Sequence, residues 1–352
     1  MATIHDVARH AGVSTATVSH VLNGTRFVRP ATRAAVEAAI EELDYTPSSV
    51  ARGLSMKHTR TIGVVIADVT APFFARLLKA VENLLTAAGY SIMVVNAYED
   101  ATREAEGLET LRQRQVDGIL ITPTGAPQDA YSGLAAIGCP IVFVERMPPG
   151  ASGSLASTDN RGAMEACVHY LHELGHRRMA IVTLDEATSA VSARVEGFER
   201  ALRALGSSPD EHLIVTCGPT LESAERAIAE ILASSAPPTA IIAGNHIASL
   251  GAMRAIRAAG LDLPTDISLI CFDNSPWTEV MLPPLTVVTK PIEELAQRAV
   301  VQLLASIDEG RRRQRDQEAP SDLPTSTVLL PAPRRRRGRG AGPGGGGGGG
   351  GG

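Results

Sequence analysis

The sequence predicts an α/β protein with a small helical unit at its N-terminus, followed by two doubly wound parallel-sheet subdomains. Three observations support this fold class. Residues 1–45 contain three short segments with helical periodicity. From residue 61 onward, Val- and Ile-rich runs of strand length alternate with helical segments, as expected for a parallel sheet covered on both faces. The alternation restarts at residue 179, which indicates two separate sheets.

The first two predicted helices are short and bounded by capping residues. Thr3, with Asp6 three residues later, forms a variant of the capping box, and Gly12 is suited to stop the first helix. Ser14 can cap a second helix over 15–22, which the following Asn-Gly pair ends. Two short helices joined by a glycine-containing turn make a helix-turn-helix.

Residues 13–24, VSTATVSHVLNG, are rich in Val and Thr, which are weak helix formers. Periodicity still favours a helix over a strand, because strict alternation is absent and one apolar face recurs at helical spacing, through Val18, Val21 and Leu22. This face should pack on the first helix, at Val7, Ala8 and Ala11. A third helix, entered at Pro30, completes the unit with the apolar residues Val36, Ile40 and Leu43.

The opposite face of the second helix is small, hydroxyl-bearing and nearly uncharged, and it comprises Thr15, Ala16, Ser19, His20 and Asn23. Such a face suits a helix that lies in the major groove of DNA. Small residues allow close approach, hydroxyls reach phosphates or base edges, and His20 can bond a purine edge. The alternative is a helix pair with a structural role only.

Charge and composition are compatible with a DNA-binding segment on an otherwise acidic chain. The net charge is −5, but residues 1–60 carry seven Arg or Lys against five acids, which leaves +2 there and −7 on the rest. The four cysteines form no closely spaced pair, as expected for reduced thiols in the cytosol. We expect neither secretion nor membrane spanning, because no apolar signal core or long apolar run is present.

The strands predicted for the first sheet are 61–68, 91–97, 118–122 and 140–145, and those for the second are 179–184, 213–217, 239–244 and 267–273. Helical segments separate them, among them 101–115, 221–234 and the stretches that end near Gly206 and Gly260. Ligands of such sheets bind at the carboxyl ends of the strands. The cleft between the two subdomains is therefore the expected pocket.

The chain resembles the LacI/GalR family of bacterial repressors, over about residues 2–331. The resemblance of the N-terminal unit rests on MATIHDVARHAGVSTATVSHVLNGTRFV and SSVARGLSMKHTRTIG, and within the family it is strongest to members that respond to purines. Further matches follow in the expected order, among them APFFARLLKAVE, RQVDGILITP, LGHRRMAIV, VSARVEGF, ISLICFDN and PPLTVVTKPIEELAQRAV. The resemblance implies a core like that of periplasmic sugar-binding proteins.

The resemblance also implies a homodimer, sometimes a dimer of dimers, that binds pseudo-palindromic operator DNA. The positions whose side chains read bases in the family are Thr15, Ala16 and His20, and Ala16 departs from the usual polar residue. Matching contacts to phosphates or the groove edge are Ser14, Thr17, Ser19, Asn23 and Arg26. Thr3 and Arg52 are further expected DNA-binding residues. The stretch SSVARGLS resembles the family's hinge helix, which inserts a leucine, here Leu54, into the minor groove.

A small-molecule effector should bind in the cleft. The matching positions are Phe73, Phe74, Arg146, Arg194, Asn245 and Asp273. Aromatic rings can stack on a sugar or base, and charged groups can bond hydroxyls or a carboxylate. His246 stands where the family usually has Asp, and residues 186–192, EATSAVS, lack the polar set expected for purine recognition. A sugar, the common effector class of the family, is therefore our expectation.

The predicted domains are a DNA-binding unit over 1–46, a hinge over 47–60, an effector-binding core over 61–331 and a disordered Arg/Gly tail over 332–352. Within the core, the first subdomain should span about 61–159 and 290–320, and the second about 160–289 and 321–331. The tail cannot bury a core, although its arginines could add nonspecific affinity for nucleic acid.

A cytosolic α/β enzyme or small-molecule sensor acting on a sugar or nucleobase is the alternative. We expect no enzyme and no cofactor, because the sequence has no Gly-rich phosphate loop, no G-x-S-x-G and no H-E-x-x-H motif. The spacing of His169, His172 and His176 would suit metal binding from one helix face. However, Gly175 should end this helix before His176. A cytoplasmic regulator located at the nucleoid is the predicted identity.

Overall fold

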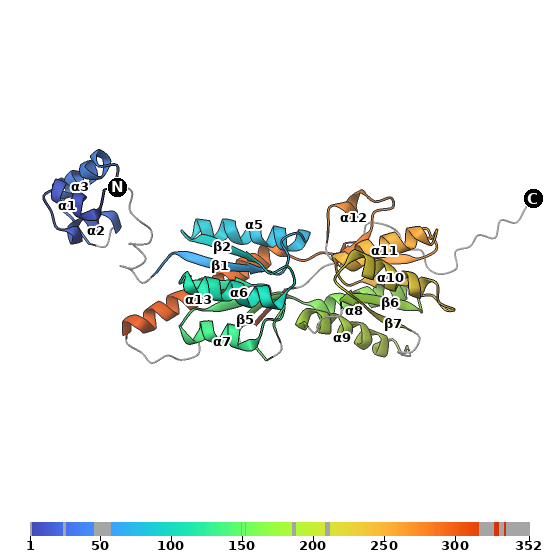
Figure 1. Cartoon of the computed structure of the whole chain (residues 1–352). Coiled ribbons are helices and arrows are strands. Elements are labelled where there is room, and N and C mark those ends of the chain that lie inside the picture. Colours follow the sequence, from blue (N-terminus) through green and yellow to red (C-terminus); the bar gives the residue numbers. More distant parts are fainter. Residues whose placement is uncertain are drawn as a thin grey trace, which may run out of the picture. The chain divides into compact units, whose positions relative to one another are not determined.

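A computed structural model describes residues 2–23, 26–45, 58–148, 150–151, 153–184, 188–207, 212–272, 274–316, 327–330 and 334–335. The chain divides into two compact units, residues 1–60 and 61–352 (Figure 1). The predicted hinge, including Arg52 and Leu54, lies outside the described residues except for its last three positions. Most of the predicted tail and the effector candidate Asp273 also lie outside them.

The first unit holds the three predicted helices, α1 (Ile4–His10), α2 (Thr15–Asn23) and α3 (Pro30–Glu42). The stretch rich in Val and Thr is therefore a helix and not a strand. One small core joins the three helices, built from Val7, Ala8, Val18, Val21, Val36 and Ala39, with Ala11, Leu22, Ile40 and Leu43 among the partly buried residues around it. Tertiary packing through this face compensates for the weak helix propensity of α2.

The ends of α1 and α2 follow the predicted capping chemistry. Thr3 and Asp6 form a complete capping box at the start of α1. Gly12 has φ +65°, a left-handed conformation that glycine adopts without cost, and it separates the two helices. The Ser14 hydroxyl accepts a hydrogen bond of 3.2 Å from the Thr17 backbone N–H and caps α2.

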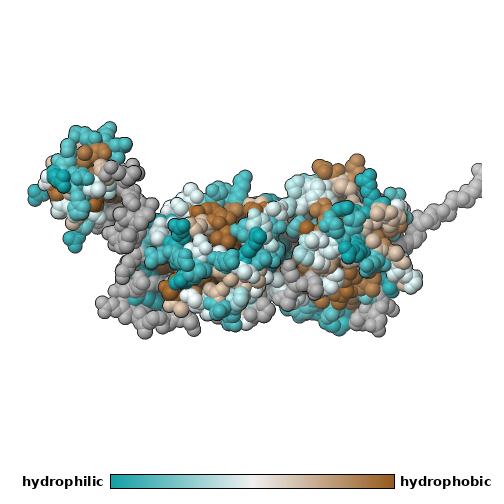
Figure 2. All heavy atoms as spheres, viewed as in Figure 1, coloured by the Kyte–Doolittle hydropathy of each residue, from teal (hydrophilic) through white to brown (hydrophobic). Residues whose placement is uncertain are grey.

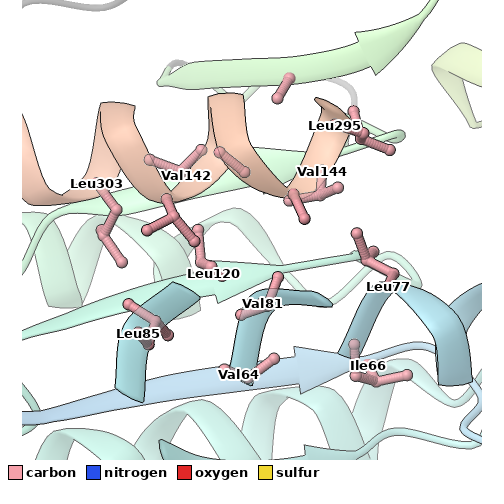
Figure 3. Close-up of a cluster of buried hydrophobic side chains, with 14 of the residues drawn as sticks. Val64, Ile66, Leu77, Val81, Leu85, Leu120, Val142, Val144, Leu295 and Leu303 are labelled. Atoms are coloured by element: carbon pink, nitrogen blue, oxygen red, sulfur yellow. The ribbon is translucent and has the colours of Figure 1, made fainter. Parts of the chain in front are cut away.

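In the second unit, the described strands form two sheets. The first has the order β11-β5-β4-β3-β1-β2, and all of its pairings are parallel. Its strands are β1 (Thr61–Ile66), β2 (Ser91–Asn96), β3 (Gly118–Ile121), β4 (Ile141–Val144), β5 (Ser154–Thr158) and β11 (Thr327–Leu330). Helices α5 (Pro72–Ala87) and α13 (Ile292–Asp316) cover one face, and α6 (Ala101–Gln113) and α7 (Gln128–Ala136) cover the other. Figure 3 shows the core under α5 and α13, where Leu77, Val81 and Leu85 approach Val64, Leu120 and Leu303.

The second sheet has the order β12-β10-β9-β8-β6-β7, with only β12 antiparallel. Its strands are β6 (Met179–Leu184), β7 (Leu213–Cys217), β8 (Ala240–Ala243), β9 (Ser268–Phe272), β10 (Thr286–Val288) and β12 (Arg334–Arg335). Helices α8 (Asn160–Glu173) and α9 (Ser189–Ala204) pack on one face, and α10 (Leu221–Leu232) and α11 (His246–Ala258) on the other. A short helix, α12 (Trp277–Val280), precedes β10.

Three features of the sheets differ from the sequence expectations. Strands β5 and β10 were not predicted. We expected residues 327–330 in the second subdomain. Instead, strand β11 pairs with β5, so these residues belong to the first sheet. Arg334 and Arg335, expected in a disordered tail, pair with β10 at the edge of the second sheet.

The chain passes from one sheet to the other after β5 and after β10, and β11 and β12 belong to different sheets. The crossovers after β5 and β10 follow the carboxyl ends of parallel strands. None of the described helices is long and apolar enough to cross a membrane.

Candidate functional sites

The exposed face of α2 is the first candidate site. Ala16 is exposed, and Thr15, Thr17, Ser19 and His20 are partly exposed. This face of α2 is therefore accessible, whereas the opposite face of the same helix packs in the core. Small side chains on an open helix face are compatible with entry into the major groove.

The other predicted DNA-contacting residues differ in the hydrogen bonds that they form within the unit. The Thr3 hydroxyl donates to Asp6 at 2.7 Å, and the Ser14 hydroxyl lies 2.9 Å from that of Thr17. These hydroxyls therefore serve as helix caps even without DNA. Arg26 is exposed, whereas the side chain of Asn23 lies outside the described part.

The second candidate site is a cavity between the two sheets, with an empty volume of about 420 Å³ that includes open solvent. Five of the six predicted effector residues line it: Phe73, Phe74, Arg146, Arg194 and Asn245. The fold brings them together from the start of α5, the end of β4, α9 and the start of α11. Parallel-sheet geometry explains this convergence, because each residue lies at or just beyond the carboxyl end of a strand or at the cleft side of a helix.

Two aromatic rings form one wall of the cavity. Phe73 and Phe74 pack edge to face, with ring centroids 5.1 Å apart and planes at 68°. Both are mostly buried, and they belong to the first turn of α5. They offer an apolar surface on which the face of a sugar or a planar ring can lie.

Arg194 is a buried cation in the opposite wall, with only 6% of its surface exposed. Its Nε donates to Asn160 Oδ1 at 2.8 Å, its Nη1 donates to the Gly244 carbonyl, and its guanidinium stacks 4.9 Å from the Phe272 ring centroid. These contacts fix the side chain in the cavity wall. A guanidinium held in this way can donate charge-assisted hydrogen bonds to a ligand hydroxyl or carboxylate.

Arg146 and Asn245 complete the predicted set. Arg146 forms a bidentate pair with Glu99, with N–O distances of 2.7 and 3.0 Å, and its guanidinium lies 5.5 Å from the Phe74 ring centroid. The Asn245 side-chain oxygen accepts from the Ala248 N–H at 2.8 Å and caps α11. Both residues are therefore held rigidly where a ligand would meet them.

Sequence reasoning missed a buried ion pair in the same cavity. Lys290 Nζ lies 3.3 Å from Glu145 Oε2, and the two side chains are 8% and 3% exposed. Lys290 also lies 4.1 Å from the Phe73 ring centroid, a cation–π contact. Glu145 is the last residue of the predicted strand 140–145, so the rule that sites lie at carboxyl ends could have found it. Lys290 gave no such signal, because strand β10 was not predicted. Leu184 also lines the cavity and was missed. Thr188, Ala190 and Val191 line it as well, and they belong to the stretch 186–192 that the sequence placed at the pocket without assigning them as effector residues.

The histidine series does not converge on a metal site. Helix α8 ends at Glu173, as expected from Gly175, and His176 is buried with its ring nitrogens 2.9 Å from Thr239 Oγ1 and 3.0 Å from Ser268 Oγ. Burial and the neighbouring Arg177 lower the pKa of His172. Within the described part of the chain, no group of three or more His, Cys, Asp or Glu residues could hold a metal ion.

Comparisons with known proteins match both units. Residues 3–48 match the model of bacterial regulatory proteins of the lacI family, and residues 59–327 match that of periplasmic binding proteins and the sugar binding domain of the LacI family. The HTH-type transcriptional repressor PurR of Pectobacterium carotovorum is 38% identical over 314 residues, which cover 88% of this chain and 92% of that protein.

Two solved structures are similar over nearly the whole chain. The Lac repressor dimer bound to operator and the anti-inducer ONPF has a TM-score of 0.77 at 26% identity, covering 96% of this chain and 98% of that one. A complex of the transcriptional regulator CelR with cellobiose has a TM-score of 0.70 at 28% identity, covering 96% of this chain and 99% of that one. Because both family models match in order and the relatives span both units, this chain belongs to the LacI family of bacterial regulatory proteins.

Proposed function

We propose that this protein is a transcriptional repressor of pseudo-palindromic operators, whose DNA affinity is set by a sugar bound in the cleft. The observation that carries the proposal is the convergence of Phe73, Phe74 and Arg194 on one cavity in a chain that also carries a helix-turn-helix unit. Apolar rings and fixed hydrogen-bond donors are the combination that a polyol requires. The cellobiose complex of CelR, a similar structure, supports the same ligand class.

In the DNA-binding unit, we assign base reading to Thr15 and His20, with Ala16 offering at most a methyl contact. Backbone contacts by Thr17, Ser19, Asn23, Arg26 and Arg52 would set the register. The assigned minor-groove wedge is Leu54, outside the described residues. Such a protein acts in the cytoplasm, at the nucleoid.

A homodimer is part of the proposal, because a pseudo-palindrome presents two equivalent half-sites. Apolar side chains that the second unit leaves exposed support it. Val280 and Leu282 are 78% and 92% exposed near α12, and Val94 is 43% exposed on the edge strand β2. Figure 2 shows hydrophobic surface over α12 and near β2 and α5. A second copy of the chain would remove this surface from water.

Selection from random DNA tests the regulator. We expect enrichment of an inverted repeat with half-sites about one helical turn apart. No enrichment would contradict operator recognition and favour the alternative, an enzyme or sensor.

A thermal-shift screen with sugars, nucleobases and amino acids tests the effector. We expect a sugar to raise the melting temperature of the second unit, because a ligand that binds only the folded state stabilises it. Arg194→Met should abolish the shift, whereas Lys79→Met, at an exposed position of α5, should retain it. A shift with nucleobases alone would overturn the sugar assignment.

A further inference from the structure

Phe27, in the segment between α2 and α3, is the most exposed aromatic residue among the large hydrophobic side chains that the structure leaves on the surface. Its side chain is 89% exposed, whereas the adjacent Val28 is partly buried against the helix core. The ring of Phe27 therefore does not pack in the core of the unit. A phenylalanine in water forgoes the free energy of burial, unless a partner covers it.

Two exposed arginines flank the ring. Arg26 and Arg29 are both exposed, and neither forms an ion pair with any carboxylate in the described part of the chain. By contrast, Arg9 lies 3.5 Å from Asp6, and Arg33 lies 3.8 Å from Glu37. The segment therefore presents an apolar ring between two uncompensated positive charges.

The surrounding sequence strengthens this charge pattern. Residues 7–36 contain four arginines and no acidic residue, whereas four of the five acids of the unit lie in 37–44. The segment begins three residues after the last residue of α2, so it is tied closely to the helix that we assign to the major groove. A partner that satisfies both features must carry regularly spaced negative charges with apolar surface between them. The sugar–phosphate backbone of DNA has this chemistry, because deoxyribose rings separate the phosphates.

We propose that Phe27 is a DNA contact that packs against deoxyribose while Arg26 and Arg29 bind the phosphates on either side. The inference rests on the proposed operator binding and adds a residue and a contact chemistry to it. Because the contact is with the backbone, it contributes affinity without reading sequence. Because it is apolar, its contribution does not depend on counterion release.

Four variants of the full-length chain test the proposal by titration of the selected operator and of a scrambled duplex over a range of salt concentrations. Phe27→Ala should weaken binding to both duplexes by about tenfold and leave the slope of log K against log salt unchanged. Phe27→Leu, which keeps apolar area, should restore most of the loss. Arg29→Gln should reduce the slope by about 0.9, the value expected for one lost phosphate contact. Ile137→Ala, a truncation at a 57% exposed position of the second unit, is the matched control and should bind as the parent does.

The melting temperature should be equal for Phe27→Ala and the parent, because an exposed ring contributes little to folding. Equal DNA affinities of Phe27→Ala and the parent would overturn the proposal. A loss confined to the operator would also overturn it, since that result makes Phe27 a base reader. Dissociation of the dimer in sedimentation, with unchanged DNA affinity at saturating protein, would assign the ring to a second copy instead. If the parent enriches no operator, the proposed function fails separately, and the scrambled duplex still decides the role of Phe27.

Discussion

Glu145 joins three parts of the second unit through one side chain. Its carboxylate accepts hydrogen bonds from the N–H and the hydroxyl of Thr158, at the end of β5, and pairs with Lys290, just after β10. Both partners lie where the chain crosses between the sheets. The backbone of Glu145 has φ +64°, a conformation that costs a non-glycine residue about 1–3 kcal/mol. The contacts of its carboxylate hold it there.

Removal of one partner of this pair should be costly. Lys290→Met leaves the Glu145 carboxylate buried without its cation, and we expect the free energy of unfolding to fall by about 3–5 kcal/mol. The double variant with Glu145→Gln should recover most of this loss, because neither member of the pair then leaves a buried charge without its partner. Urea unfolding followed by the fluorescence of Trp277, the only tryptophan of the chain, measures both. Lys79→Met, at an exposed position, is the control and should change little. Equal losses in the single and double variants would contradict the coupling.

At the scale of elements, glycines decide how closely neighbouring helices approach. A Cβ atom on Gly197 in α9 would lie 2.5 Å from the carbonyl oxygen of Arg161 in α8. A Cβ atom on Gly251 in α11 would lie 2.7 Å from that of Ala224 in α10. No atom lies within 4 Å of the corresponding position on Gly133 in α7. The two helix pairs of the second subdomain therefore depend on glycine, and α7 does not.

Alanine at these positions should have effects of opposite sign. Gly197→Ala and Gly251→Ala should lower the free energy of unfolding by about 1–3 kcal/mol, because the added methyl group forces the helices apart. Gly133→Ala should raise it by up to about 1 kcal/mol, because alanine favours the helix and meets no obstacle. Thermal unfolding of the three variants beside the parent measures the effects. Stabilisation by Gly197→Ala would show that α8 and α9 can separate without cost.

The same scale shows what the sequence could predict. Runs of Val and Ile identified β1, β3, β6 and β8 because buried parallel strands are continuously apolar. Strand β5, SLAST, was missed because it has no such run, and β10 was missed because it has only three residues. The sheet to which β11 belongs could not be read from its own residues, since its partner β5 lies about 170 positions earlier in the chain.

Phe73, Phe74, Arg194 and Asn245 were predicted from the resemblance to the family. Their convergence on one cavity agrees with the rule that the sites of parallel sheets lie beyond the carboxyl ends of the strands. Lys290 was not predictable. It follows β10, where the chain crosses between the two sheets, and β10 could not be recognised from the sequence. The contact of Lys290 with Phe73 likewise depends on three-dimensional packing and not on spacing in the sequence.

At the scale of the whole molecule, control of DNA binding by the cleft requires that the two subdomains have more than one arrangement. In the structure, the Met147 N–H donates a 2.9 Å hydrogen bond to Ser189 Oγ, which joins the loop after β4 to the start of α9. The Lys290–Glu145 pair and Phe73 line the cavity together with Arg146 and Ala190, the chain neighbours of Met147 and Ser189. A ligand that fills the cavity must therefore interact with both subdomains at once. It shifts the equilibrium between arrangements only as far as its affinities for them differ.

Thermodynamic linkage makes this coupling measurable from either end. If a sugar changes operator affinity by a given factor, operator must change sugar affinity by the same factor, typically 5- to 150-fold. Calorimetric titration of the sugar into the protein, with and without a saturating operator duplex, gives the second factor, and DNA titration with and without the sugar gives the first. A scrambled duplex at the same concentration is the control. Its effect on sugar affinity should be smaller, because a scrambled duplex lacks the base sequence that the operator presents. Suppose that the sugar changes operator affinity but binds the free and the operator-bound protein equally well. This result would violate the thermodynamic cycle of the two ligands, and it would show that the sugar acts on DNA binding through a site or species outside this two-ligand scheme.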